Sequence, residues 1–98
     1  MGLPSCVRGH RDITHDCETP LRLECSDNVL LHGIGWSRMG DDNTTHIFGP
    51  KCKQSHARPI AVGSRTVLVN GRGAGRITDS VSACTNVDEG FVDILTGG

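Results

Sequence analysis

The sequence predicts a small all-β protein made of three β-repeats with threefold pseudosymmetry and stapled by a metal ion. Three observations support this prediction. One stretch of the chain recurs with the same spacing of glycine, arginine and aspartate. Glycines and prolines interrupt every window long enough for a helix, and apolar residues do not recur at helical spacing. Histidine and cysteine close the copies of the repeat, as expected of metal ligands.

The composition indicates that the fold needs an additional stabilising cross-link such as a metal. The 98 residues are enough for one domain, spanning 1–98. A domain of this size is only marginally stable when its apolar core is the sole source of stability. Aromatic residues are scarce, with one Trp, two Phe and no Tyr, and thirteen glycines raise the entropic cost of folding. Such a chain needs a disulfide, a metal or a partner to be stable.

The charge pattern and the absence of long apolar stretches limit the possible functions. The formal net charge is −1 and no basic run is present, which argues against a nucleic-acid surface. No stretch approaches the roughly 18 apolar residues of a membrane span. Residues 1–6 lack the charged and apolar regions of a secretory signal, so we expect the protein to be made in the cytoplasm.

The chain contains five cysteines and five histidines. Because cysteines stay reduced in a cytoplasm, this mixture predicts metal ligands rather than disulfides, and the odd number of cysteines agrees. We expect at least two or three of the cysteines to be small buried apolar residues instead.

The internal repeat is clearest between residues 25–46 and 63–84, which align without a gap. The apolar run, the Gly-x-Gly and the Arg-x-x-Asp all fall in register. The identical pairs are Ser26/Ser64, Val29/Val67, Leu30/Leu68, Gly33/Gly71, Gly35/Gly73, Arg38/Arg76 and Asp41/Asp79.

A third copy is split between the two ends of the chain. Residues 92–98 match the strand-and-glycine half, and residues 3–17 match the second half. Arg8 takes the place of the repeat arginine, and Asp12 lies near the place of the aspartate, one residue out of register. A copy completed by joining the two ends predicts a closed object, because an open solenoid would need distinct caps.

Each copy is expected to contain a hairpin. The short branched-apolar runs 29–33 and 66–71 end in turn residues, which is typical of strands. Asn70-Gly71 is a strong hairpin signal. The dipeptides 32–33 and 96–97 are expected to occupy the same turn in the other copies.

The end of each copy carries a soft ligand: His15, with Cys17 two residues later, His46 and Cys84. His46 and Cys84 align without a gap. A metal site tolerates exchange of histidine and cysteine, whereas a packing site does not, because the two side chains differ in volume. Threefold pseudosymmetry would bring the three ends together near the axis.

A fourth ligand would complete the tetrahedron that is usual for structural zinc. Cys52 and His56 both follow the middle copy and are the two candidates for it. Cys17 is the substitute for His15. Mixed nitrogen and sulfur ligands favour one structural zinc ion, with iron as the alternative. His10 and His32 are not expected to bind the metal.

No catalytic constellation emerges, and the chain is not expected to be an enzyme or to bind a small-molecule substrate. The glycine-rich stretch 70–76 lacks the Gly-Lys-Ser/Thr ending of a phosphate-binding loop. A metallohydrolase would need an open metal position and a nearby base, and Glu18, Glu24 and Glu89 have no motif around them.

These residues resemble the PAAR-repeat family, whose repeat runs from a strand through Asn-Gly, Lys-Pro-Ala-Ala-Arg and x-Gly-Asp to a loop bearing His or Cys. Residues 66–84 follow that pattern, and residues 29–41 form a diverged second copy. The resemblance covers nearly the whole chain. The Pro-Ala-Ala core is altered to Gly-Ala-Gly, Gly-Trp-Ser and Ser-Cys-Val in the three copies.

The resemblance implies a small cone whose base sits on the blunt end of a trimeric β-helix spike, one cone per trimer. Its point would hold a metal, usually zinc, bound by three histidines and one cysteine. That composition favours the set His15, His46, His56 and Cys84, with Cys52 as the first substitute for His56.

By this resemblance, the chain would cap and sharpen the spike of a contractile injection machine and contact the target outer membrane. The absence of an extension at either end predicts a bare tip, most similar to the spike tip of a T4-like phage baseplate and located in the virion. The tip of a secreted type VI spike is the alternative location. The alternative function is a small zinc-stabilised module that binds protein or nucleic acid.

Overall fold

The computed structural model describes residues 2–98 of the chain. Within that range the chain forms short β-strands and one 3₁₀ turn, with no α-helix, so the all-β prediction is confirmed. The described part measures 39 × 26 × 21 Å. None of its helices is long and apolar enough to cross a membrane.

The strands pair into two-stranded antiparallel sheets, most of them hairpins of neighbouring strands. The exception joins the two ends of the chain, since β1 pairs with β10. The pairs are β1 (Leu3–Ser5) with β10 (Phe91–Thr96), β2 (Leu30–Leu31) with β3 (Ile34–Gly35), β4 (His46–Phe48) with β5 (Gln54–His56), β6 (Leu68–Val69) with β7 (Arg72–Gly73), and β8 (Ser80–Val81) with β9 (Thr85–Asn86).

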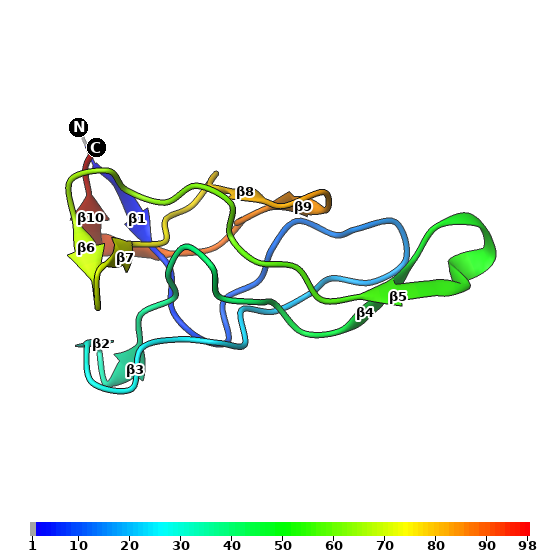
Figure 1. Cartoon of the computed structure of the whole chain (residues 1–98), viewed down its shortest axis with the longest axis horizontal. Helices are drawn as coiled ribbons and strands as arrows, with labels where there is room; N and C mark the ends of the chain where they lie inside the picture. Colours follow the sequence, from blue (N-terminus) through cyan, green and yellow to red (C-terminus); the bar gives the residue numbers. More distant parts are fainter. Residues whose placement is uncertain (1) are drawn as a thin grey trace.

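The sheets lie at different ends of the molecule. In Figure 1 the pairs β1–β10, β2–β3 and β6–β7 lie at the left-hand end, where the C-terminus is also found. The hairpin β4–β5 and the 3₁₀ turn η1 (Pro50–Cys52) in its loop form the opposite end. We call residues 46–56 the distal hairpin, and the pairs β1–β10, β2–β3 and β6–β7 the strand-pair end.

Turn chemistry explains two of the hairpins. The turns 32–33 and 70–71 have left-handed backbones, with φ of 52° and 79° in the first and 53° and 78° in the second. A two-residue hairpin turn of this kind favours Asn-Gly and its relatives. Both predicted hairpins are confirmed. The third predicted turn is wrong at Thr96, which lies in β10 and pairs with Leu3.

The Gly-x-Gly of the repeat serves close packing. A Cβ atom on Gly35 would collide with the backbone carbonyl of Ser26, and one on Gly73 with that of Ser64. Ser26 and Ser64 each accept hydrogen bonds from two backbone amides just after them. The repeated serine and glycine therefore allow the segment before each hairpin to pack directly against the second strand of that hairpin.

A closed ring of backbone hydrogen bonds links the three segments that follow β1, β3 and β7. The Cys6 amide donates to the Gly75 carbonyl at 3.1 Å, the Gly75 amide to the Ser37 carbonyl at 2.8 Å, and the Ser37 amide to the Cys6 carbonyl at 3.1 Å. Two residues later the pattern recurs, because Arg8, Met39 and Ile77 each donate to another of the three segments.

The ring corrects the register expected for the N-terminal copy. Cys6 corresponds to Ser37 and Gly75, so the residue matching Arg38 and Arg76 is Val7 and not Arg8. Arg8 is exposed instead. The alignment by residue type was one position out because the backbone pairing, rather than the arginine, sets the register.

The same shift applies to the expected aspartate. The amides of Arg38 and Arg76 donate to the carboxylates of Asp41 and Asp79 three residues later. In the N-terminal copy the Val7 amide donates to Nδ1 of His10 at 3.1 Å, so His10 occupies that position.

Asp12 has a different partner from the one that the repeat suggests. Its carboxylate accepts from Arg22 at 2.9 Å, and both side chains are completely buried. Arg22 lies outside the expected copies, so the sequence pattern did not connect the two residues.

The apolar core is small, as the composition predicted. Its cluster consists of Cys6, Ile60, Val81 and Val87, with Cys84 packed against it. Cys6 is therefore one of the cysteines that acts as a buried apolar residue, and burial raises the pKa of its thiol to about 12. Buried ion pairs share the interior with this cluster.

Candidate metal centre

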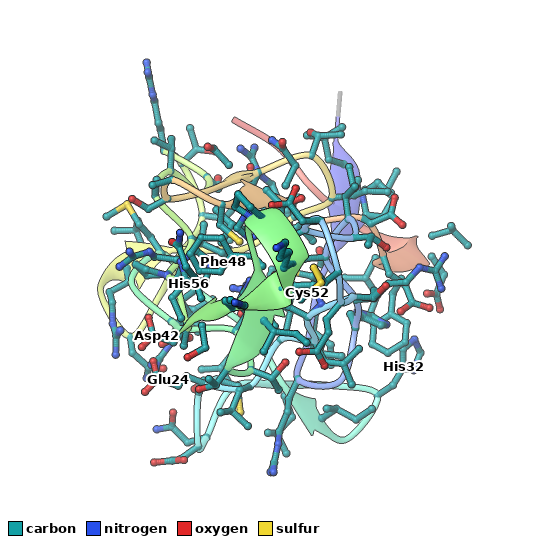
Figure 2. The ribbon with its side chains drawn as sticks, turned by 90° about the vertical axis from the view of Figure 1, so that its right-hand side faces the viewer. Glu24, His32, Asp42, Phe48, Cys52 and His56 are labelled. Carbon is teal, nitrogen blue, oxygen red and sulfur yellow. A yellow bond between two sulfur atoms is a disulfide. The ribbon has the colours of Figure 1, made fainter. Side chains whose placement is uncertain are left out.

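Four side chains that can ligate a metal converge at the paired ends of the distal hairpin: His15, His46, His56 and Cys84. One ligand atom from each lies within 4.8 Å of all the others. Figure 2 views the molecule from the distal end and shows His56 close to Phe48 there.

The spacing of the donor atoms suits a tetrahedral ion. His15 Nδ1, His46 Nε2 and His56 Nε2 are each 3.1 Å from the other two. Cys84 Sγ lies 3.1 Å from His15 Nδ1 and 3.3 Å from His46 Nε2. Zinc bonds of about 2.0–2.1 Å to nitrogen and about 2.3 Å to sulfur would separate tetrahedral donors by roughly 3.3–3.6 Å. The four residues could therefore hold one metal ion.

Strand pairing places two of the ligands side by side. His46 opens β4 and His56 closes β5, and the register of this hairpin sets them directly opposite each other. Adjacent side chains on one face of an antiparallel pair lie close enough to share a ligand.

Two tight turns place the other two ligands, His15 and Cys84, in the donor cluster. His15 begins a turn that closes at Glu18, with Asp16 in a left-handed conformation. Cys84 follows Ala83, whose φ of 51° tightens the connection between β8 and β9.

The ligands at the ends of the three copies have the same spacing in the sequence as the residues of the backbone ring. His15 and His46 are 31 positions apart, and His46 and Cys84 are 38 positions apart. The same separations relate Cys6 to Ser37 and Ser37 to Gly75 in the ring. The ends of the copies thus meet, and His56 adds a fourth donor from outside the repeats.

Neighbouring groups select the ring nitrogen that faces the cluster. Nδ1 of His46 lies 2.8 Å from the Thr44 carbonyl, so it carries the proton and leaves the lone pair on Nε2 toward the other donors. His15 presents Nδ1 to the cluster, and its Nε2 lies 4.0 Å from the Asp16 carboxylate. Such outer partners orient ligands in metal sites.

Burial perturbs two of the four groups. It raises the pKa of the Cys84 thiol, and a hydrogen bond from Asn43 opposes this shift. Burial and the neighbouring His46 lower the pKa of His56. A metal ion binds neutral imidazole and thiolate, so binding would release the thiol proton.

The two substitute ligands are elsewhere. Cys17 and Cys52 are joined in a disulfide, which corrects the expectation that the cysteines are reduced. Their sulfur atoms are bonded to each other and do not belong to the donor cluster. The two residues are 35 positions apart, and only the packing of the turn 15–18 on the distal hairpin brings them together.

His10 and His32 also lie outside the cluster, as the sequence suggested. His10 accepts a hydrogen bond from the Val7 amide, and His32 contacts the exposed carboxylate of Asp93 at 2.9 Å.

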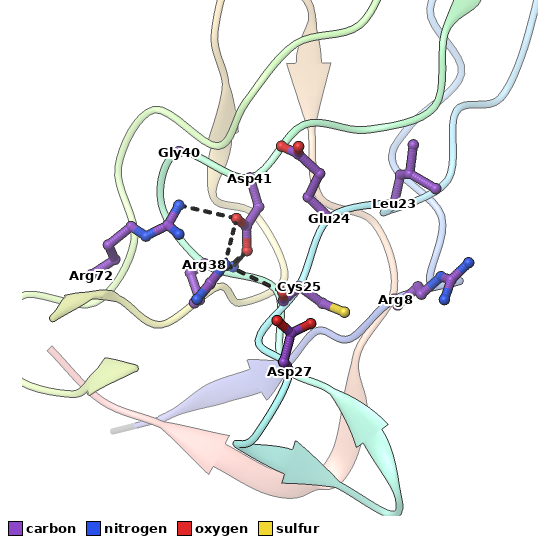
Figure 3. A pocket seen from close by; sticks show the side chains of 9 residues that line it. All are labelled: Arg8, Leu23, Glu24, Cys25, Asp27, Arg38, Gly40, Asp41 and Arg72. Atoms are coloured by element: carbon purple, nitrogen blue, oxygen red, sulfur yellow. Dashed lines mark hydrogen bonds and ion pairs between the residues drawn. The ribbon is translucent and has the colours of Figure 1, made fainter. Parts of the chain in front are cut away.

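A polar hollow of about 520 Å³ is separate from these donors, because none of the four lines it. Figure 3 shows its central ion pairs, in which Arg38 and Arg72 both contact the carboxylate of Asp41. These charges satisfy one another, so the hollow suggests no ligand.

Comparison with known proteins does not add to the picture. No family model matches the chain, and no curated protein matches it.

Proposed function

We propose that this chain is the structural tip of a contractile injection machine. In this proposal it caps the blunt end of a trimeric β-helix spike, with one chain per trimer, and sharpens it for piercing the target cell envelope. Its three β-repeats form a cone with threefold pseudosymmetry, and one structural metal ion, zinc before iron, staples the point. The resemblance to PAAR repeats motivates the proposal, and features at both ends of the molecule support it.

The observation that carries the proposal is a set of three exposed leucines at the strand-pair end. Leu30 lies opposite Gly35, Leu68 opposite Gly73, and Leu95 opposite Pro4, which are corresponding positions in the ring register. The three leucines are 51%, 60% and 58% exposed. Val92 of β10 adds another strongly exposed side chain at this end.

Three equivalent apolar residues suit a trimeric partner. The end of a β-helix leaves backbone groups unpaired, and such edges invite other chains. A single chain with three corresponding strand pairs can meet one edge of each spike subunit. Burying the leucines there would remove apolar surface from water.

The distal hairpin needs a source of rigidity other than the apolar core. The buried cluster of the core contains no residue of the distal hairpin, and η1 buries none of its side chains. A metal that joins three backbone segments supplies rigidity where a narrow end has too little volume for a core. Four protein donors leave no tetrahedral position for water, which favours a structural over a catalytic role.

The test is a binding stoichiometry. The purified, zinc-loaded chain is mixed with a trimeric β-helix spike from the same genome, and the mass of the complex is measured by light scattering. We expect one chain per trimer. If a folded and metal-loaded chain binds no such spike, the tip proposal fails and a free-standing zinc module becomes the better explanation.

A further inference from the structure

We propose that the Cys17–Cys52 disulfide and the metal centre are thermodynamically coupled, so that each strengthens the other. The inference rests on the metal centre of the proposed function and not on the spike. It implies that the metal affinity of the site depends on the redox state of the surrounding solution.

Both cross-links join the same two segments. His15 and Cys17 belong to the turn 15–18, which closes through the bridge between His15 and Glu18. His46 and His56 are the paired ends of the distal hairpin, and Cys52 lies in its loop. Figure 1 shows η1, which contains Cys52, and β5, which contains His56, at the same end of the molecule. A metal and the disulfide would therefore tie the turn to the hairpin at two points.

Besides the stacking of Phe48 on His15, with ring centroids 4.7 Å apart, the other ties between these segments are exposed hydrogen bonds. The Asp16 carboxylate accepts from the Gly49 amide at 2.9 Å, and the Glu18 carboxylate accepts from the Ile47 amide at 2.6 Å. Hydrogen bonds that compete with water contribute little net stability. Since η1 buries no side chain, packing holds its loop only weakly. The relative position of the two segments therefore depends on the cross-links and on this one ring contact.

Coupling follows from the entropy of the chain. With the disulfide closed, His15 stays near His46 and His56, so binding a metal orders less of the chain. With the metal bound, the two sulfur atoms stay near each other, so the disulfide is harder to open. Linkage requires that both effects have the same size.

The redox step is ordinary thiol–disulfide exchange. An external dithiol, or two molecules of a monothiol such as glutathione, reduces the bond between Cys17 and Cys52, gives up two electrons and two protons, and becomes a disulfide. The products in this chain are two thiols. The metal keeps its oxidation state throughout, because zinc has no redox chemistry.

The first test measures zinc affinity with a competing chromophoric chelator. The oxidised chain is compared with the Cys17→Ser/Cys52→Ser variant, which cannot form the bond. We expect ~5- to 150-fold weaker binding in the variant, the usual range for coupled sites. Cys25→Ser is the matched control, because Cys25 is a free cysteine outside the donor cluster, and it should keep the affinity unchanged.

The second test measures the reverse effect without relying on zinc affinity. The fraction of open disulfide is determined by thiol alkylation and mass spectrometry in glutathione buffers of increasing reducing strength, at fixed free zinc. The zinc-loaded chain should need a more reducing buffer than the zinc-free chain, by the same factor as in the first test. His56→Ala, which lacks one donor, should show a smaller shift.

Each outcome is decisive. Equal zinc affinity with and without the disulfide overturns the coupling and leaves the metal centre intact. A zinc-loaded chain that is reduced more easily than the zinc-free chain also overturns it, and indicates that the freed thiolates replace a histidine ligand. If neither protein binds zinc, the coupling and the metal centre both fail, while spike binding remains to be decided by its own measurement.

Discussion

The phenyl ring of Phe48 stacks on the imidazole of His56, with ring centroids 4.0 Å apart and planes inclined by 24°. The same phenyl ring stacks on His15 at 4.7 Å and 18°. Phe48 thus covers two of the four candidate ligands and limits both their rotation and their contact with water.

Replacing Phe48 with Ala should therefore weaken the retention of zinc. Losing an outer partner of a metal site costs about 10- to 100-fold in affinity, and we expect the lower end of this range because the contact is apolar. The measurement is the rate of zinc transfer to a chelator. Ile47→Ala is the control, since Ile47 is an exposed neighbour in β4. Equal rates for both variants would show that the stacking has no role.

Removing a ligand should destabilise the fold as well as the binding of metal. Structural zinc contributes roughly 10–16 kcal/mol in small zinc-folded peptides, so His46→Ala or Cys84→Ser should lower stability by several kcal/mol. Thermal unfolding with and without a chelator measures the effect. His32→Ala serves as the control because its side chain is half exposed and outside the cluster. A folded, metal-free double variant at positions 46 and 84 with the stability of the wild type would contradict the stapling role.

The exposed leucines should control binding to the spike and not stability. Changing Leu30, Leu68 and Leu95 together to Asp places three charges on the surface that would be buried against the trimer, where an unpaired charge is costly. We expect loss of the complex in light scattering and little change in thermal unfolding. Leu23→Asp alters another exposed leucine, 44% accessible, outside these strand pairs and should bind normally. Normal binding by the triple variant would place the interface elsewhere.

Arg22 should be essential to the interior. Its removal leaves the carboxylate of Asp12 buried without its cation, and breaking a buried pair costs about 3–5 kcal/mol. Urea unfolding of Arg22→Met tests this expectation. The exposed pair of Arg11 with Asp88 provides the comparison, because Arg11→Met should cost at most about 1 kcal/mol. Similar losses for both variants would argue against the buried pair.

His10 should make the fold sensitive to mild acid. Burial lowers the pKa of His10, with Glu89 opposing the shift, and the neutral ring accepts the Val7 amide. Between about 6.5 and that lowered folded value, the unfolded chain binds the proton and the folded chain does not, so stability falls as the pH drops through this window.

The variant His10→Asn keeps an acceptor but does not titrate. Its stability should fall less than that of the wild type between about pH 7.5 and pH 5.5, as measured by urea unfolding. The two proteins differ only at position 10, so the difference between their pH profiles reports on His10. Parallel losses would show that His10 contributes nothing to the pH dependence.

The sequence by itself determined the local elements of this protein. The hairpins at 32–33 and 70–71 follow from turn residues whose backbone preference is intrinsic, so no distant contact is needed to predict them. The gap-free alignment of His46 with Cys84 also pointed to two side chains that meet, because equivalent positions in a repeat have equivalent surroundings.

The tertiary structure decided the rest. The ring of backbone hydrogen bonds placed Val7, and not Arg8, at the repeat position of the arginines, and it gave the place of the aspartates to His10. The same packing joined Cys17 to Cys52 across 35 positions and selected His56 over Cys52 for the donor cluster. These features depend on which distant segments meet, and residue type and spacing carry no record of that pairing.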